Sequence, residues 1–96
     1  MIDSLQITRS TNDGTTKQIE ALAHEDGTGG TETFAWQICA QSKTTTETFT
    51  ANQKKVIQVT HTASGVCVVS VKATSHASTA SDKRTLNVDK NPEDLG

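Results

Sequence analysis

Apolar and polar residues alternate along several short segments of this chain, and this period of two dictates its secondary structure. In the segment TFAWQI, Phe34, Trp36 and Ile38 occupy every second position. Successive side chains of a β-strand point to opposite faces, so these three side chains lie together on one face of a predicted strand. Trp36, the only tryptophan of the chain, is therefore predicted to be a buried core residue.

The same alternation recurs in further segments that are separated by polar or glycine-containing turns. VCVVSVKATS and RTLNV show it most clearly. Helix signals are weak, and TKQIEALAHE also fits a strand with Ile19, Ala21 and Ala23 inward. The stretch AQSKTTTE is polar and featureless, with room for a short edge strand near TETFTAN. The predicted structural core consists of Phe34, Trp36, Ile38, Cys67, Val69, Val71, Leu86 and Val88.

About seven short strands with polar turns and no helix between them predict an all-β fold, an antiparallel immunoglobulin-like β-sandwich. A chain of 96 residues holds one domain, which we expect to span residues 1–90. Residues 91–96 form an acidic C-terminal tail, and Pro92 is expected to keep this tail out of any sheet.

The two cysteines could form one bridge or remain as free thiols, and the sequence favours free thiols. Strand parity places Cys39 on the outer face, opposite to Phe34 and Ile38, whereas Cys67 falls at an inward position of a later strand. A bridge between them would require a bulge that turns one of the two side chains around.

Charge and motifs exclude several classes of function. The net charge is −2 and the nine lysines and arginines are scattered, so nucleic acid is not an expected partner. The apolar runs are too short to span a membrane, and the N-terminus lacks the features of a signal peptide. His24, His61 and His76 each stand alone as expected solvated residues, and Glu25 and Asp26 in HEDG are expected to form an ordinary polar turn.

Cys67 occupies a core position, where a thiol is usually inert. We therefore predict no catalytic residue, no metal site and no cofactor, and the chain is not expected to be an enzyme.

Five segments follow one another along the chain: first a glycine-rich loop, then TFAWQI, then a polar stretch with ETFTA, then VCVVSVKATS and finally RTLNV. Over about residues 4 to 89 this arrangement resembles the immunoglobulin-like modules of tailed-phage virion proteins, in particular outer-capsid decoration proteins of the Hoc type. PKD-type modules of bacterial surface proteins share the same two main strands. The resemblance implies that Trp36 is the buried strand-C tryptophan and that Val69 and Ala21 stand where antibody-type domains carry their inter-sheet disulfide.

The resemblance implies a structural protein of a phage virion, a capsid or tail decoration or accessory protein that attaches to the shell and displays a hydrophilic surface. Its partner would be the major capsid protein or another virion protein, host-surface glycans could add weak adhesion, and its location would be the virion, after assembly in the host cytoplasm. An adhesive or spacer module of a bacterial surface protein or glycosidase remains the alternative. Candidate partner-binding residues are Met1, Ile2, Leu5, Val66, Val68, Glu93 and Asp94.

Overall fold

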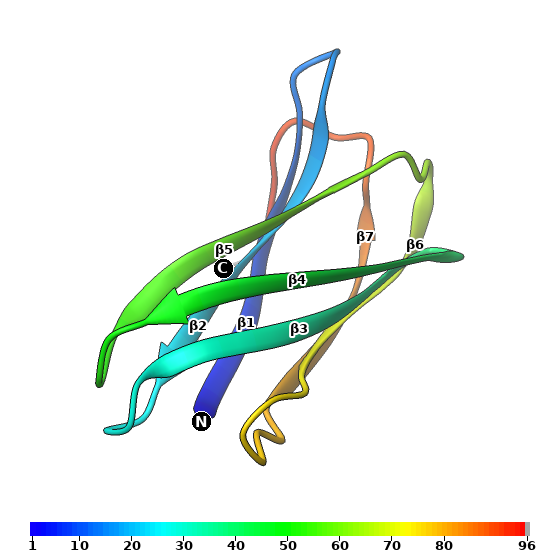
Figure 1. Ribbon diagram of the computed structural model, residues 1–96. Coiled ribbons are helices and arrows are strands. Elements are labelled where there is room, and N and C mark those ends of the chain that lie inside the picture. The colour runs from blue at the N-terminus through cyan, green and yellow to red at the C-terminus, as the bar shows by residue number, and fades with distance from the viewer. Residues whose placement is uncertain (96) are drawn as a thin grey trace.

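The computed structural model describes residues 1–95 and shows two antiparallel four-stranded sheets packed face to face (Figure 1). The strands are β1 (Ile2–Asn12), β2 (Lys17–Glu25), β3 (Gly30–Ile38), β4 (Gln41–Phe49), β5 (Lys54–His61), β6 (Val66–Ala73), β7 (Ser81–Asn87) and β8 (Glu93–Asp94). One sheet has the order β5-β2-β1-β8 and the other has the order β4-β3-β6-β7. The predicted all-β sandwich is therefore confirmed.

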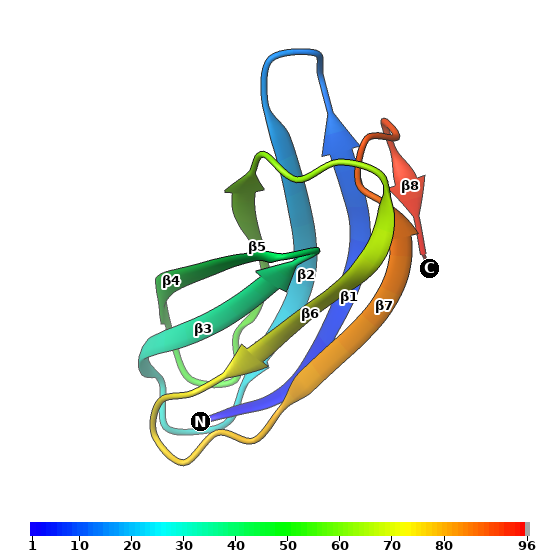
Figure 2. The same cartoon turned by 90° about the vertical axis from the view of Figure 1, so that its right-hand side faces the viewer.

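The chain changes sheet four times, and this path gives the sandwich an immunoglobulin-like strand order. The hairpins β1-β2 and β3-β4 lie in different sheets, β5 returns to pair with β2, and β6 then crosses to pair with β3 (Figure 2). The connections at one end bring together the N-terminus, the β2-β3 turn and the β6-β7 loop (Figure 1).

The core lies between the inner faces of the two sheets, at the positions that alternation predicts. Trp36 is 2% exposed, and Phe34 and Ile38 on the same strand are fully buried. The indole nitrogen of Trp36 donates a hydrogen bond to Thr45 Oγ1 at 2.8 Å, so the polar atom of this large side chain is satisfied. The predicted core positions Val69, Val71, Leu86 and Val88 are also buried, whereas Cys67 is half-buried against the core.

The prediction for the segment after β3 is wrong, because β4 is a full strand of nine residues. Its inner side chains are polar where β4 forms the margin of the sandwich, and Lys43, Thr45 and Glu47 replace the apolar residues of other strands. The apolar period of two is therefore hidden. The strand is instead supported by threonine, a residue that favours pleated surfaces.

The prediction for the C-terminal tail is also wrong. Glu93 and Asp94 form β8, which pairs with Ser10 and Arg9 of β1, and Asp94 Oδ1 lies 2.7 Å from Arg9 Nε. Pro92 follows a cis peptide bond and precedes the two paired residues. Its missing N–H therefore removes no hydrogen bond from this short ladder.

The cysteines form a disulfide, which overturns the prediction of free thiols. Cys39 lies in the two-residue turn between β3 and β4 with a φ of 55°, so its side chain no longer follows the parity of β3. Its Cα atom lies 5.3 Å from that of Cys67 at the start of β6. The bridge joins neighbouring strands of one sheet, while Ala21 and Val69, in opposite sheets, are buried without a bridge.

Candidate functional site

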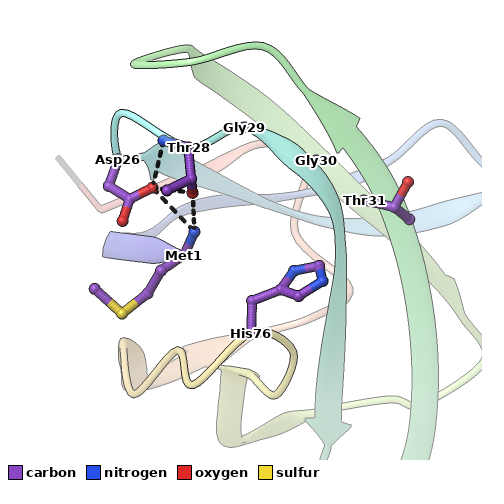
Figure 3. Close-up of a pocket in the computed structure, with 7 residues that line it drawn as sticks. All are labelled: Met1, Asp26, Thr28, Gly29, Gly30, Thr31 and His76. Atoms are coloured by element: carbon purple, nitrogen blue, oxygen red, sulfur yellow. Dashed lines mark hydrogen bonds and ion pairs between the residues drawn. The ribbon is translucent and has the colours of Figure 1, made fainter.

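The loop end of the sandwich contains an open hollow of about 600 Å³ (Figure 3). The N-terminus, the β2-β3 turn, the start of β3 and the β6-β7 loop contribute its lining residues, which are Met1, Asp26, Thr28, Gly29, Gly30, Thr31 and His76. In immunoglobulin-like sandwiches, loops gathered at one end form a natural binding surface. We therefore take this hollow as the candidate site.

The β2-β3 turn is held by local hydrogen bonds and by glycine conformations. Asp26 Oδ1 accepts hydrogen bonds from the backbone N–H of Thr28 at 3.0 Å and from its hydroxyl at 2.5 Å. Gly29 has a φ of 71°, and a Cβ atom there would lie 3.1 Å from the backbone nitrogen of Ala51. A larger residue at this position would push the β2-β3 turn away from the β4-β5 turn.

The β6-β7 loop contains backbone strain at two consecutive residues. His76 and Ala77 have φ values of 52° and 60°. Residues other than glycine rarely adopt this left-handed backbone conformation. Strain of this kind persists only where surrounding contacts fix it. Here Ser78 Oγ accepts a hydrogen bond from Ile2 N at 2.8 Å, and Ser75 Oγ accepts one from Thr33 N at 2.8 Å.

Two glutamates with no solvent exposure lie beneath the hollow, Glu25 at the end of β2 and Glu32 in β3. The amino group of Met1 donates a hydrogen bond to Glu25 Oε1 and lies 3.2 Å from Glu32 Oε2. It also donates a hydrogen bond of 3.1 Å to Asp26 Oδ1 (Figure 3). One ammonium group thus faces three carboxyl groups.

A second set of contacts reaches Glu32 from the β6-β7 loop. Ser75 Oγ donates to Glu32 Oε1 at 2.7 Å, and His76 Nδ1 lies 3.3 Å from the same oxygen. The buried carboxylate therefore connects β3 with the strained loop that forms one wall of the hollow.

The pKa values of the two buried glutamates are shifted in opposite directions. Burial and the neighbouring Glu32 raise the pKa of Glu25. Burial also raises the pKa of Glu32, but hydrogen bonds from Glu25, Ser75 and the Met1 amino group outweigh it and lower this pKa to about 2. The pKa of Glu25 is therefore raised while that of Glu32 is lowered, so Glu25 keeps its proton to a higher pH than Glu32 does. Among residues 1–95, no hydrogen-bond donor satisfies the buried oxygens Glu25 Oε2 and Glu32 Oε2, although the Met1 amino group lies 3.2 Å from Glu32 Oε2 as an ion-pair partner.

The amino group of Met1 completes the charge balance. The hydrogen bond to Glu25 is the largest contribution that raises its pKa, with further contributions from Asp26 and Glu32, and the resulting pKa is about 11. The buried glutamates cannot touch a ligand directly, so the hollow offers the exposed polar atoms of Asp26, Thr28 and His76. Among the described residues, no group of three histidines, cysteines or acidic residues is arranged to hold a metal ion.

The candidate partner-binding residues do not form one surface. Met1 lines the hollow, but Ile2 and Leu5 are 1% and 9% exposed and belong to the core, so the prediction that they contact a partner is wrong. Both side chains face inward although three positions separate them, because the register of β1 shifts between Ile2 and Ser4.

The remaining candidates lie elsewhere on the sandwich. Val66 and Val68 are 70% and 47% exposed on the outer face of β6. Glu93 and Asp94 are occupied within the chain, since Glu93 accepts a hydrogen bond from Asn87 N and Asp94 pairs with Arg9.

The sequence did not reveal the buried acidic pair, and the prediction that Glu25 lies in a polar turn is wrong. Strand parity could have revealed it. Glu25 continues the inward series of Ile19, Ala21 and Ala23, and Glu32 has the parity of Phe34. His61, predicted to be solvated, is instead 2% exposed, and burial lowers its pKa.

Comparison of the chain with protein-family models, with curated proteins and with solved structures found no match. None of residues 1–95 belongs to a helix that is long and apolar enough to cross a membrane.

Proposed function

We propose that this chain is a non-enzymatic attachment and display module of a phage virion, a decoration or accessory protein of the capsid or tail. Its partner in this proposal is the major capsid protein or another virion protein, and its free surface contacts host glycans weakly at most. The exposed valine pair on β6 is the observation that carries the proposal.

Val66 and Val68 form a local apolar patch on a polar sheet face. β3 pairs with β6 only from Val69 to Ala73, so the two valines lie where β6 extends beyond the end of β3, with β7 as their neighbouring strand. Their cross-strand neighbours on β7 are Asn87 and Thr85. Exposed apolar side chains inside a polar surround are typical of a contact site with another protein.

The rest of this outer face supports display. The outward side chains of β3 and β4 include Thr31, Thr33, Thr44, Thr46 and Thr48, as their cross-strand pairing shows. The outward positions of β6 and β7 add two lysines, and no carboxylate projects from this face within the described residues. A hydroxyl-rich face of this kind stays hydrated and soluble when the module is present in many copies.

The disulfide stiffens the same region. Cys39 and Cys67 fix the β3-β4 turn to the start of β6, directly beside Val66 and Val68. A patch on a rigid scaffold loses little conformational entropy on binding, so a small apolar contact contributes more of its free energy to attachment.

The test is co-sedimentation of the purified protein with undecorated capsids and with isolated tails. We expect stoichiometric binding by the native chain and a loss of at least tenfold in affinity for V66S/V68S. V56S is the matched control, because Val56 is 55% exposed on the outer face of the other sheet. Absence of binding to every virion shell, or equal losses in V56S and V66S/V68S, would contradict the proposal.

The disulfide favours a second candidate, an adhesive or spacer module of a bacterial surface protein. Disulfides persist in oxidising environments such as the periplasm and cell or virion surfaces, and a surface protein passes through them during export. A virion protein assembled in the cytoplasm would acquire the bridge only after release. The two candidates are distinguished by alkylating free thiols either in intact host cells or directly after lysis, and by measuring the fraction of the protein whose cysteines are disulfide-bonded. Only the exported module is already oxidised in intact cells.

A further inference from the structure

The outer edge of β4 is unpaired among the described residues, because β4 ends the sheet order β4-β3-β6-β7. The edge is nine residues long, and Figure 2 shows it at the open margin of its sheet. An unpaired strand edge presents a row of backbone N–H and C=O groups that another strand can bind.

The register with β3 determines which backbone groups of β4 face outward. A two-residue turn, Cys39–Ala40, makes Ile38 and Gln41 a hydrogen-bonded pair, so alternate residues from Gln41 bond to β3. The outward groups therefore belong to Ser42, Thr44, Thr46 and Thr48. The carbonyl of Thr48 confirms this assignment, since it accepts a hydrogen bond from Lys55 Nζ of β5 at 3.0 Å.

The charges of β4 are self-complementary about Thr45. Two antiparallel copies of β4 with Thr45 opposite Thr45 place Lys43 of each copy opposite Glu47 of the other. In the same register Thr44 faces Thr46, and the outward backbone groups of both residues are aligned for hydrogen bonds.

Lys43 is available for this pairing. It makes no ion pair with any residue in the range 1–95, although its side chain is half-buried on the inner side of the sheet. Glu47 contacts Lys55 at 3.4 Å, and its side chain is 36% exposed. In a monomer the inward charges of β4 are only partly paired, whereas the two-fold register gives Lys43 a carboxylate.

The edges of β5 and β7 differ from that of β4. β5 carries Lys54 and Lys55 and no acidic residue, so no register of β5 against itself gives a pair of opposite charges. The edge of β7 lies beside β1, to which it is joined by a hydrogen bond of 2.8 Å from Ile7 N to Asp82 Oδ2.

We propose that two copies of this chain associate through their β4 edges, antiparallel and centred on Thr45, to form one continuous sheet across a two-fold axis. Such an interface is isologous and closes at two copies. Its area is that of a single strand pairing, at the low end of specific interfaces, so a dissociation constant in the range of about 10 μM to 1 mM is expected.

Sedimentation velocity across that concentration range tests the charge register. The variants are made in a K55Q background, so that Glu47 contacts no other lysine and the Thr48 carbonyl is free. K43E and E47K each place like charges opposite one another twice in a dimer, and we expect each to weaken association about tenfold. K43E/E47K restores opposite charges and returns the dissociation constant to within about threefold of the background.

A monomeric background protein at about 1 mM overturns the proposal, as does a double swap that is as weak as the single swaps. T44P separates edge pairing from other modes of association. The N–H of Thr44 points outward, so proline there leaves the β3-β4 ladder intact and removes a donor that only the dimer uses. Circular dichroism confirms that T44P folds.

Loss of association in T44P with retention in V66S/V68S supports the β4 edge. The reverse pattern would place the interface on the valine face and overturn the proposal. If the β4 edge instead binds a strand of an unrelated protein, that binding would be insensitive to charge swaps at Lys43 and Glu47. This result would also overturn the proposed dimer.

Discussion

The disulfide between Cys39 and Cys67 closes a loop in which the two cysteines are separated by 28 residues. Replacing both cysteines by alanine releases this constraint mainly in the unfolded chain. For a loop of this length, the loss of chain entropy corresponds to about 3.6 kcal/mol at 25 °C. Both side chains are half-buried at the end of the sheet, so loss of packing adds little. We therefore expect C39A/C67A to lose about 3.6 kcal/mol of unfolding free energy.

Urea unfolding measures this loss directly. Trp36 is the only tryptophan and is 2% exposed, so its fluorescence reports the opening of the core. With a urea m-value of about 1.2 kcal/mol/M for a domain of this size, the midpoint falls by about 3 M. The m-value itself rises, because an unfolded chain without the bridge exposes more surface.

The reduced native chain is the internal control. It should unfold with the same free energy as C39A/C67A, and the reductant should leave the variant unchanged. A difference below about 1 kcal/mol between the oxidised native chain and C39A/C67A would refute the loop-entropy argument. If the native chain matches C39A/C67A only after it has been reduced, the bridge rather than the cysteine side chains carries the stability.

Other predictions concern the buried carboxyl pair and the indole. The Met1 amino group has a pKa of about 11 in the folded chain and 8.0 in the unfolded chain. Its stabilisation of the fold is therefore complete below pH 8.0 and is lost as the pH rises through 11. Measuring the unfolding free energy at increasing alkaline pH tests this, and N-terminal acetylation should abolish the pH dependence. Glu32 has a folded pKa of about 2 against 4.5, so its stabilisation is present above pH 4.5 and is lost as the pH falls through 2; E32Q should remove this dependence and destabilise the fold at pH 7, as urea unfolding across pH will show. Glu25 has a raised pKa, so its stabilisation is present below pH 4.5 and is lost as the pH rises; E25Q keeps the neutral form and should unfold at equal or higher urea concentration than the native chain at pH 7. T45V removes the acceptor of the Trp36 N–H bond and should cost about 1 kcal/mol in the same assay.

The sequence predicts the fold where burial and alternation coincide. Phe34, Trp36 and Ile38 are large, apolar and spaced by two, and this pattern has no stable alternative to a strand with one buried face. The same reasoning places Val69 and Val71 in the core. In these strands, local sequence carries the information because every inward position lies beneath the facing sheet.

Local sequence fails where a distant segment decides the environment. The burial of Glu25 depends on its contacts with the amino group of Met1, which is 24 positions away, and with Glu32. The disulfide depends on a left-handed turn residue, Cys39, rather than on the strand pattern before it. The strand β8 depends on pairing with β1, whose partner residues are more than 80 positions away in sequence. These features follow from tertiary contacts that no period of two contains.

The two proposals constrain one another through the geometry of the sheet. A two-fold axis that relates antiparallel edge strands stands perpendicular to the sheet, so the same face of both copies points in the same direction. β6 is separated from the β4 edge by β3. A β4-paired dimer therefore leaves Val66 and Val68 uncovered and presents both valine patches on one side.

Such a dimer would bind a shell of repeated sites through two contacts, and the second contact forms at high effective concentration. K43E should then weaken binding to assembled capsids by more than it weakens binding to an isolated capsid protein, because only the assembled shell offers two sites to one dimer. V66S/V68S should weaken both, because it acts on each contact. Equal losses of K43E on the shell and on the isolated protein would show that dimer formation contributes nothing to attachment, even if both interfaces exist.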